Sequence, residues 1–346
     1  MQTIVFAGGG TAGHVMPNLA VMEALGGAYN CVYVGGDGME KDICAARGIP
    51  FYRIDTVKLR RDAVIKNLAI PFKLGKCVRS AKRVLNEIKP DLVFSKGGFA
   101  ALPVVLAAKD TPVLCHESDF TPGIVTKLSK RKSVYVLCSF EPCAKLFKNG
   151  LFSGAPLRPS LYRGTKRDFG FADRNKPKLL VMGGSSGAAA INDCVVSALP
   201  ELCKTFNVVH LTGKNKSGGA RQSGYCPIEF ENDMAGLYAS VDVAITRGGA
   251  NALAELAALK IPSLVIPLEK ASRGDQVQNA RYFAEKGAVK VLREQDMTAA
   301  TLADGARALL TERTKYSNAL SSMKTDGTAR ICAVIEKTLA ERKRRI

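Results

Sequence analysis

Long apolar segments are missing from this sequence of 346 residues. The longest apolar run covers residues 99–108, contains Pro103 and reaches only about half the length that a bilayer span requires. Residues 1–7 form a short apolar stretch with neither a basic lead-in nor a small-residue cleavage site. We therefore expect no membrane-spanning segment and no secretory signal.

Closely spaced cysteine pairs are missing as well. None of the ten cysteines belongs to a C-x-x-C pair, and only three histidines could help to complete a metal site. Several cysteines, including Cys115 and Cys138, lie in apolar runs, where a thiol packs as a small core residue. The spacing favours reduced, structural cysteines in a cytoplasmic protein.

Acidic residues are scarce relative to basic ones, 31 against 50, which gives a net charge of +19. Basic chains bind nucleic acids, anionic lipids or acidic substrates. The sequence has no paired Cys/His finger pattern, no aromatic RNP strand motif and no basic region followed by heptads. We therefore expect no nucleic-acid partner, and charge alone does not choose between the other two classes.

Apolar strand-like runs alternate with longer helix-like segments, which is typical of parallel α/β sheets. The chain is too long for one ordinary core, so two domains are expected. The candidate strands cover residues 3–7, 31–34, 92–95, 113–116, 133–138, 179–182, 208–211, 241–246 and 263–266.

Two segments in different halves of the chain share one order of features: an apolar strand, a glycine turn and a helix start. In the first, the turn covers residues 8–13, and in the second it covers residues 183–187. Two Rossmann-like domains, 1–157 and 158–346, are the simplest architecture, with the boundary in a proline-containing stretch. A ligand would lie between the carboxyl-end faces of the two sheets.

The first glycine turn permits more than one interpretation. Gly8, Gly10 and Gly13 match the dinucleotide fingerprint, and Asp37 follows the next strand, which suggests a nicotinamide or flavin enzyme. A tight turn without a ligand is the alternative. His14 follows the glycines, and an imidazole there could take a proton near neutral pH, which argues against a dinucleotide site. A structural histidine is the alternative.

The second half offers groups suited to a nucleotide diphosphate. Amides and hydroxyls of the turn 183–187 lie at a helix start, where the helix dipole favours negative charge. No D-x-D triplet occurs, so a transferase would stabilise departing UDP with amides, dipoles and cations such as Arg158. Glu255 could accept hydrogen bonds from two ribose hydroxyls. A surface arginine and a helix-surface glutamate are the competing interpretations.

Basic residues bracket apolar ones in residues 60–83, which is typical of a membrane-surface contact. A solvated helix pair is the alternative. The predicted patch consists of Leu68, Ile70, Phe72, Lys73, Leu74 and Lys76.

Segments in register over nearly the whole chain resemble glycosyltransferase family 28. They are residues 8–14, 97–99, 116–123, 183–187, 247–255, 272–276 and 279–280. The resemblance implies a GT-B fold, in which two Rossmann-like domains face each other across a cleft. It implies inverting transfer of N-acetylglucosamine from UDP to the 4-hydroxyl of the muramyl sugar of lipid I, which gives lipid II. The enzyme would need no metal cofactor and would act peripherally at the cytoplasmic face of an anionic cell membrane.

The resemblance also assigns residues. His14 and Glu117 are the candidate bases. The last helix, from about residue 331 to 346, would pack back on the first domain. The acceptor diphosphate would contact Gly10, Thr11, Gly97 and Gly98. The donor would contact Thr11, Ala12, Gly13, Asp119, Arg158, Ser185, Glu231, Ala250, Asn251, Ala252, Leu253, Ala254, Glu255 and Gln276.

Three positions depart from the family pattern. Ala12 stands where glycine is frequent, Asp119 where many members have asparagine, and Ser186 where glutamine is frequent. The Asp119 contact to the donor sugar is the one most affected. A glycosyltransferase acting on diacylglycerol, a nicotinamide-dependent oxidoreductase and a nucleic-acid-binding protein are the rival functions.

Overall fold

A computed structural model describes residues 1–57, 70–183, 188–213, 222–269 and 274–344. The chain forms two compact units, one of Met1–Arg158 with Asp326–Ile346 and one of Pro159–Thr325. Arg158 therefore ends the first unit, one residue later than the boundary expected from the sequence. None of the described helices is long and apolar enough to cross a membrane.

The first unit is built on a seven-stranded parallel sheet with the order β3-β2-β1-β4-β5-β6-β7. Its strands are β1 (Thr3–Ala7), β2 (Asn30–Gly35), β3 (Phe51–Arg53), β4 (Leu92–Ser95), β5 (Val113–Glu117), β6 (Tyr135–Cys138) and β7 (Gly150–Phe152). Its helices are α1 (Ala12–Leu25), α2 (Met39–Ala45), α3 (Ile70–Ile88), α4 (Ala101–Ala107), α5 (Ile124–Ser129), α6 (Glu141–Ala144) and α13 (Thr328–Lys343).

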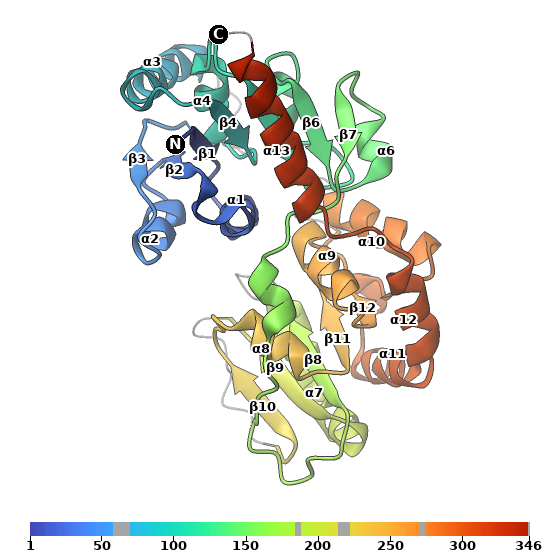
Figure 1. The fold of residues 1–346 in the computed structure, drawn as a ribbon. Coiled ribbons are helices and arrows are strands. Elements are labelled where there is room, and N and C mark those ends of the chain that lie inside the picture. Colours follow the sequence, from blue (N-terminus) through green and yellow to red (C-terminus); the bar gives the residue numbers. More distant parts are fainter. Residues whose placement is uncertain (58–69, 184–187, 214–221, 270–273, 345–346) are drawn as a thin grey trace. The chain divides into compact units, whose positions relative to one another are not determined.

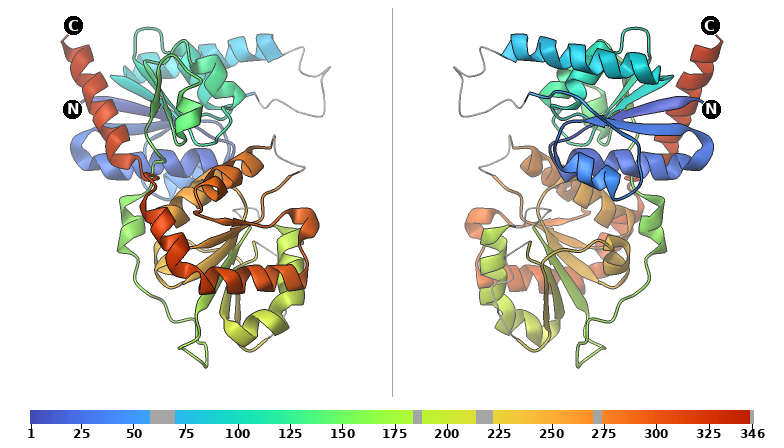
Figure 2. Two further views of the ribbon diagram at one scale, coloured as in Figure 1. Left: turned by 90° about the vertical axis from the view of Figure 1, so that its right-hand side faces the viewer. Right: turned by 90° about the vertical axis from the view of Figure 1, so that its left-hand side faces the viewer.

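Helices cover both faces of this sheet, which explains why residues 4–7 of β1 are all apolar rather than alternating. Ile4 and Phe6 belong to a core cluster shared with α1 and α13, whereas Val5 and Ala7 belong to a second cluster shared with α3 and α4. Successive strand residues point to opposite faces. The two helix layers of this unit can be followed in Figure 2.

The C-terminal helix α13 is part of the first unit (Figure 1). Ile331, Ile335 and Leu339 recur every four residues, so they form one buried stripe that packs in the cluster with α1. The Thr328 hydroxyl donates to the carbonyl of Leu157 and accepts from its amide, each at 2.8 Å. This pair ties the start of α13 to the end of the preceding part of the same unit.

The second unit contains a six-stranded parallel sheet with the order β10-β9-β8-β11-β12-β13. Its strands are β8 (Lys178–Met182), β9 (Asn207–Leu211), β10 (Tyr225–Ile228), β11 (Val243–Thr246), β12 (Ser263–Val265) and β13 (Lys290–Val291). Its helices are α7 (Ala189–Thr205), α8 (Met234–Ala239), α9 (Ala250–Ala258), α10 (Asp275–Glu285), α11 (Ala299–Thr311) and α12 (Arg313–Ser321).

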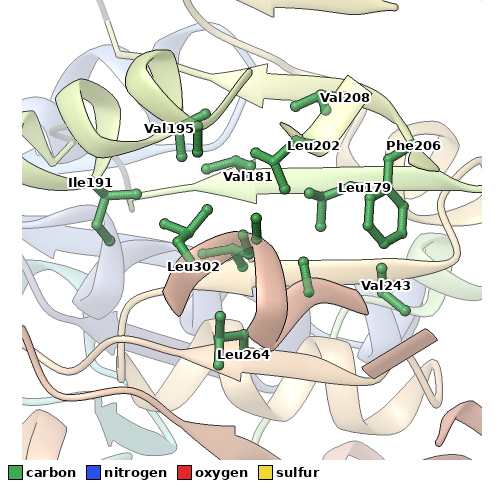
Figure 3. Packing of buried hydrophobic residues seen from close by; sticks show 14 of the residues in the cluster. Leu179, Val181, Ile191, Val195, Leu202, Phe206, Val208, Val243, Leu264 and Leu302 are labelled. Carbon is green, nitrogen blue, oxygen red and sulfur yellow. The ribbon is translucent and has the colours of Figure 1, made fainter. Parts of the chain in front are cut away.

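Helices α7 and α11 enclose the main core of the second unit. Figure 3 shows Leu179 and Val181 of β8 beside Val195 and Leu202 of α7, with Leu302 of α11 below them. All five side chains are 3% exposed or less. Burial of such aliphatic side chains stabilises the unit by about 1.5–3 kcal/mol each.

Strand order reverses between β1 and β4 in the first sheet and between β8 and β11 in the second. Ligands of open α/β sheets bind outside the carboxyl ends of strands at such reversal points. The predicted α/β fold with two Rossmann-like domains is confirmed. The turns after β1, β4, β8 and β11 therefore lie where open α/β sheets bind their ligands.

Candidate functional site

The first glycine turn, residues 8–11 between β1 and α1, is held from behind by Glu40 on α2. The Glu40 carboxylate, 2% exposed, accepts hydrogen bonds from the amides of Gly10 at 3.2 Å and Gly36 at 3.1 Å. A Cβ on Gly9 would collide with the same carboxylate. Sequence reasoning missed Glu40, and the only sequence signal for it was a glutamate two residues after Gly38, the last glycine of the turn that follows β2.

His14 lies in the first turn of α1 and is partly buried. Its Nδ1 shares a hydrogen bond of 3.0 Å with the Thr11 hydroxyl. Burial and the neighbouring Lys96 ammonium lower the pKa of His14 to about 4, against a smaller raising effect of a hydrogen bond with Gly9. The imidazole is therefore neutral at neutral pH, the form that accepts a proton.

The turn after β4 packs directly on the first glycine turn. Gly97 and Gly98 have φ angles of 83° and 77°, in the region that favours glycine. A Cβ on Gly98 would lie 2.5 Å from the Gly9 carbonyl oxygen and 3.2 Å from Nδ1 of His14. The structure thus brings together the predicted residues of the β1 and β4 turns.

Lys96, which the sequence analysis did not single out, precedes these glycines and is only 3% exposed. Burial lowers the pKa of Lys96, while the carboxylates of Glu117 and Asp119 oppose this shift. The carboxyl-end edge of the first sheet therefore carries a buried lysine beside the two turns.

Glu117, the second candidate base, ends β5 and holds the turn that follows it. One of its oxygens accepts from the amide of Gly123 at 2.8 Å and the hydroxyl of Thr126 at 2.6 Å. The other accepts from the amide of Asp119 at 3.2 Å. Glu117 and the predicted donor residue Asp119 thus lie in one turn, where the carboxylate organises the local backbone.

The second glycine turn precedes α7, and its residues 184–187, including the predicted Ser185, lie outside the described part of the chain. A buried polar network supports the start of α7. The Asn192 amide donates to the Thr212 carbonyl at 2.8 Å, and its oxygen lies 3.1 Å from Nε2 of His210. Nδ1 of His210 lies 3.0 Å from the Tyr225 hydroxyl. Burial lowers the pKa of His210 to about 4.

Helix α9 carries the predicted ribose ligand Glu255. Its carboxylate is partly buried and accepts a hydrogen bond of 2.9 Å from the Tyr238 hydroxyl on α8. Sequence reasoning missed Tyr238. Of the other residues predicted on this helix, Asn251 and Ala252 are partly buried, whereas the side chains of Ala250, Leu253 and Ala254 are buried in the core.

The turn between β11 and α9 packs against the start of α10. The predicted sugar contact Gln276 accepts a hydrogen bond from the Leu268 amide at 3.0 Å, and a Cβ on Gly248 would collide with the Gln276 carbonyl. The Asn279 amide donates to the Gly248 carbonyl at 3.1 Å. Arg247, in the same turn, is 7% exposed, and its guanidinium donates a hydrogen bond to the Glu294 carboxylate at 2.6 Å.

The remaining predicted donor contacts in the described residues include Glu231, Arg158, Ala12 and Gly13. Glu231, one of the predicted donor contacts, pairs with Arg167 and accepts from the Asp233 amide at 2.7 Å. Arg158 is partly exposed at the end of the first unit. Ala12 is partly buried and Gly13 exposed at the start of α1.

The predicted membrane patch is only partly described. Leu68 and the side chain of Ile70 lie outside the described residues. On α3, Phe72 is 85% exposed and Leu74 is partly buried. The neighbouring Lys73 and Lys76 are exposed and line a hollow of about 450 Å³.

Among the described residues, no three His, Cys, Asp or Glu side chains converge in a way that could hold a metal ion. The cysteines of these segments are free thiols, and most of them are buried.

Models of one family match both halves of the chain. The glycosyltransferase family 28 N-terminal domain matches residues 4–137, and the family 28 C-terminal domain matches residues 178–334.

Curated relatives match almost the whole length. A UDP-N-acetylglucosamine–N-acetylmuramyl-(pentapeptide) pyrophosphoryl-undecaprenol N-acetylglucosamine transferase of Lachnospira eligens is 45% identical over 329 residues, 91% of this chain and 93% of the relative. A protein of the same name from Clostridium botulinum is 40% identical over 352 residues, 97% of this chain and 99% of the relative.

Solved structures of glycosyltransferases are similar in fold to this chain. The crystal structure of Acinetobacter baumannii MurG is similar with a TM-score of 0.76 and 28% identity, covering 97% of this chain and 100% of that one. The calicheamicin glycosyltransferase CalG4 has a TM-score of 0.71 at 17% identity over 99% of each chain, a likeness of fold alone.

Proposed function

This chain belongs to glycosyltransferase family 28, and we propose that it transfers N-acetylglucosamine from UDP to the muramyl sugar of lipid I, forming lipid II for peptidoglycan. The observation that carries this proposal is the 45% identity, over 91% of the chain, to a relative named for that transfer. Both family domains match in the expected order.

The acceptor is assigned to the first unit, at the turns after β1 and β4. Gly10, Thr11, Gly97 and Gly98 are the candidates for contact with the acceptor diphosphate, because helix starts and glycine turns present amides to anions. The Gly10 amide already donates to Glu40, so Gly10 is the weaker candidate of the four.

His14 is the proposed base. The acceptor 4-oxygen attacks the anomeric carbon of N-acetylglucosamine from the face opposite UDP. The new C–O bond forms as the bond from that carbon to the diphosphate oxygen breaks, with the electron pair leaving on UDP. The hydroxyl proton passes to the neutral imidazole. Glu117 remains the alternative base, although its contacts with Gly123 and Thr126 favour a role in holding its turn.

The donor is assigned mainly to the second unit. Glu255 would accept hydrogen bonds from the ribose hydroxyls, and Gln276 would contact the sugar. The start of α7 with Ser185, together with Arg158, would face the diphosphate, where helix dipoles and cations favour negative charge. We assign no metal to this step because the sequence has no D-x-D triplet.

We propose that the protein binds lipid I at the cytoplasmic surface of the membrane. On α3, the exposed Phe72 is close in sequence to the exposed Lys73 and Lys76. On α5, Ile124 and Leu128 are 50% and 55% exposed in a segment rich in lysine. Apolar side chains among cations suit shallow insertion into an anionic interface.

The test is an incubation of the full chain with UDP-N-acetylglucosamine and lipid I, and separately with diacylglycerol. We expect a β-1,4-linked disaccharide on the lipid only in the first reaction. Turnover of diacylglycerol alone, or tight binding of NADH with indifference to UDP, would overturn the proposal.

A further inference from the structure

Tyr238 lies between two parts of the proposed donor site in the second unit. Its side chain is 3% exposed, and its hydroxyl is 2.9 Å from a carboxylate oxygen of Glu255 and 3.7 Å from the sulfur of Met182. Met182 is the last residue of β8, next to the second glycine turn. One phenol therefore contacts the proposed ribose ligand and the strand that leads to the proposed diphosphate turn.

The direction of the hydrogen bond follows from chemistry. An ionised carboxylate only accepts, so the phenol is the donor. A single hydroxyl proton cannot serve both neighbours at once, and a charged oxygen at 2.9 Å is a much stronger acceptor than a thioether at 3.7 Å. The Tyr238 hydroxyl therefore donates its hydrogen bond to the Glu255 carboxylate.

The helix that carries Tyr238 is fixed at both ends. At its start, the Asp233 side chain accepts from the Gly236 amide at 2.9 Å. At its end, the Ser240 hydroxyl donates to the Gly236 carbonyl at 2.6 Å. Leu237 and Tyr238 are both buried. The phenol is therefore presented from a rigid element rather than from a surface side chain.

We propose that Tyr238 is a positioning residue for the nucleotide donor, whose hydroxyl holds the Glu255 carboxylate in the orientation that accepts the ribose hydroxyls. This inference rests on the function proposed above. A carboxylate offers about four acceptor positions, enough for the phenol and two ribose hydroxyls together. Without the phenol, the glutamate must lose rotamer freedom when the donor binds, which weakens binding.

The first experiment compares Tyr238→Phe with the wild-type enzyme. The substitution keeps the ring and removes only the hydroxyl. We expect the KM for UDP-N-acetylglucosamine to rise roughly 10-fold, the effect of losing one hydrogen bond to a charged group, while kcat and the acceptor KM stay within about twofold. Tyr316→Phe is the matched control, because Tyr316 is also a buried tyrosine of this unit, and it should leave the donor KM unchanged.

A second experiment uses a donor that lacks the ribose 2′-hydroxyl. If Tyr238 acts through Glu255, both changes affect the same contact. The penalty for removing the 2′-hydroxyl, measured as the rise in the donor KM, is then large in the wild-type enzyme and small in Tyr238→Phe. Equal penalties in the two enzymes would overturn the positioning role. So would a Tyr238→Phe enzyme with a lowered Tm and an unchanged donor KM, since that result describes a core residue only.

A double variant separates an effect through Glu255 from an effect of Tyr238→Phe on the rest of the site. Adding Tyr238→Phe to Glu255→Ala should leave the donor KM no higher than Glu255→Ala alone, and a further rise would contradict the proposal. Failure of the proposed function is a separate outcome. In that case the wild-type enzyme itself would show no turnover of UDP-N-acetylglucosamine with lipid I.

Discussion

Replacement of Glu40 by glutamine tests whether the first glycine turn depends on a carboxylate behind it. Glu40 accepts from two amides, one on Gly10 and one on Gly36. Glutamine has almost the same shape but only one acceptor oxygen, and its NH₂ group can only donate, so it cannot accept a hydrogen bond from a backbone N–H. One of the two hydrogen bonds must therefore be lost.

Burial decides which hydrogen bond is lost. Gly36 is buried and Gly10 is exposed, and a buried donor without a partner costs more than one that can turn to water. The glutamine oxygen will therefore face Gly36, and its NH₂ group will meet the Gly10 amide and displace the turn. The loss of a hydrogen bond to a charged group is worth about 1.5–3 kcal/mol, roughly 10- to 150-fold in an equilibrium or rate.

The assay is steady-state kinetics with lipid I as the varied substrate. Glu40→Gln should lower kcat/KM for the acceptor by roughly 10- to 150-fold and leave UDP binding unchanged, because the donor is assigned to the other unit. Asp42→Asn, on the exposed side of the same helix, is the control and should behave as wild type. Wild-type acceptor kinetics in Glu40→Gln would refute the idea that the carboxylate orders the turn.

Three further outcomes follow from the site. His14→Ala should reduce kcat by roughly 10²–10⁴ while UDP binding by titration persists, because a general base acts in the chemical step; unchanged turnover removes His14 from the mechanism. Glu255→Ala should raise the donor KM and spare the acceptor KM, and the reverse pattern contradicts its ribose role. His210, with its pKa lowered to about 4, stays neutral in the folded chain while the unfolded chain protonates below about pH 6.5. The free energy of unfolding should therefore fall as pH drops from 6.5 to 4, by about 3 kcal/mol from this group, and denaturant titrations of a His210→Gln variant should show a smaller fall.

The sequence predicted the interior of both sheets and missed their edges. The strands without a candidate were β3, β7, β10 and β13, and these four are the outermost strands of the two sheets. Central parallel strands are covered on both faces, so their residues form continuous apolar runs that stand out in a sequence. Edge strands are short and less buried, as the two residues of β13 illustrate, and leave little apolar signal.

The same contrast applies to the site. His14 and Glu255 could be predicted because each follows a glycine turn along the chain. Glu40 and Tyr238 were missed, because the contact that matters to the site joins each to a residue far away in sequence, 30 positions for Glu40 and Gly10 and 17 for Tyr238 and Glu255. A hydrogen bond between distant positions leaves no local pattern, and only the sheet order brings the partners together.

The glycines of these turns are also required by packing within the protein. In a sequence, a glycine turn after a strand suggests close approach of a ligand. In this structure the space that a Cβ would need at Gly9, Gly98 and Gly248 is already taken by protein atoms, from Glu40, the Gly9 carbonyl and the Gln276 carbonyl respectively. These turns are therefore packed from behind before any substrate arrives. Such packing fixes the direction of their amides in advance, so that binding a diphosphate requires little further ordering of the backbone.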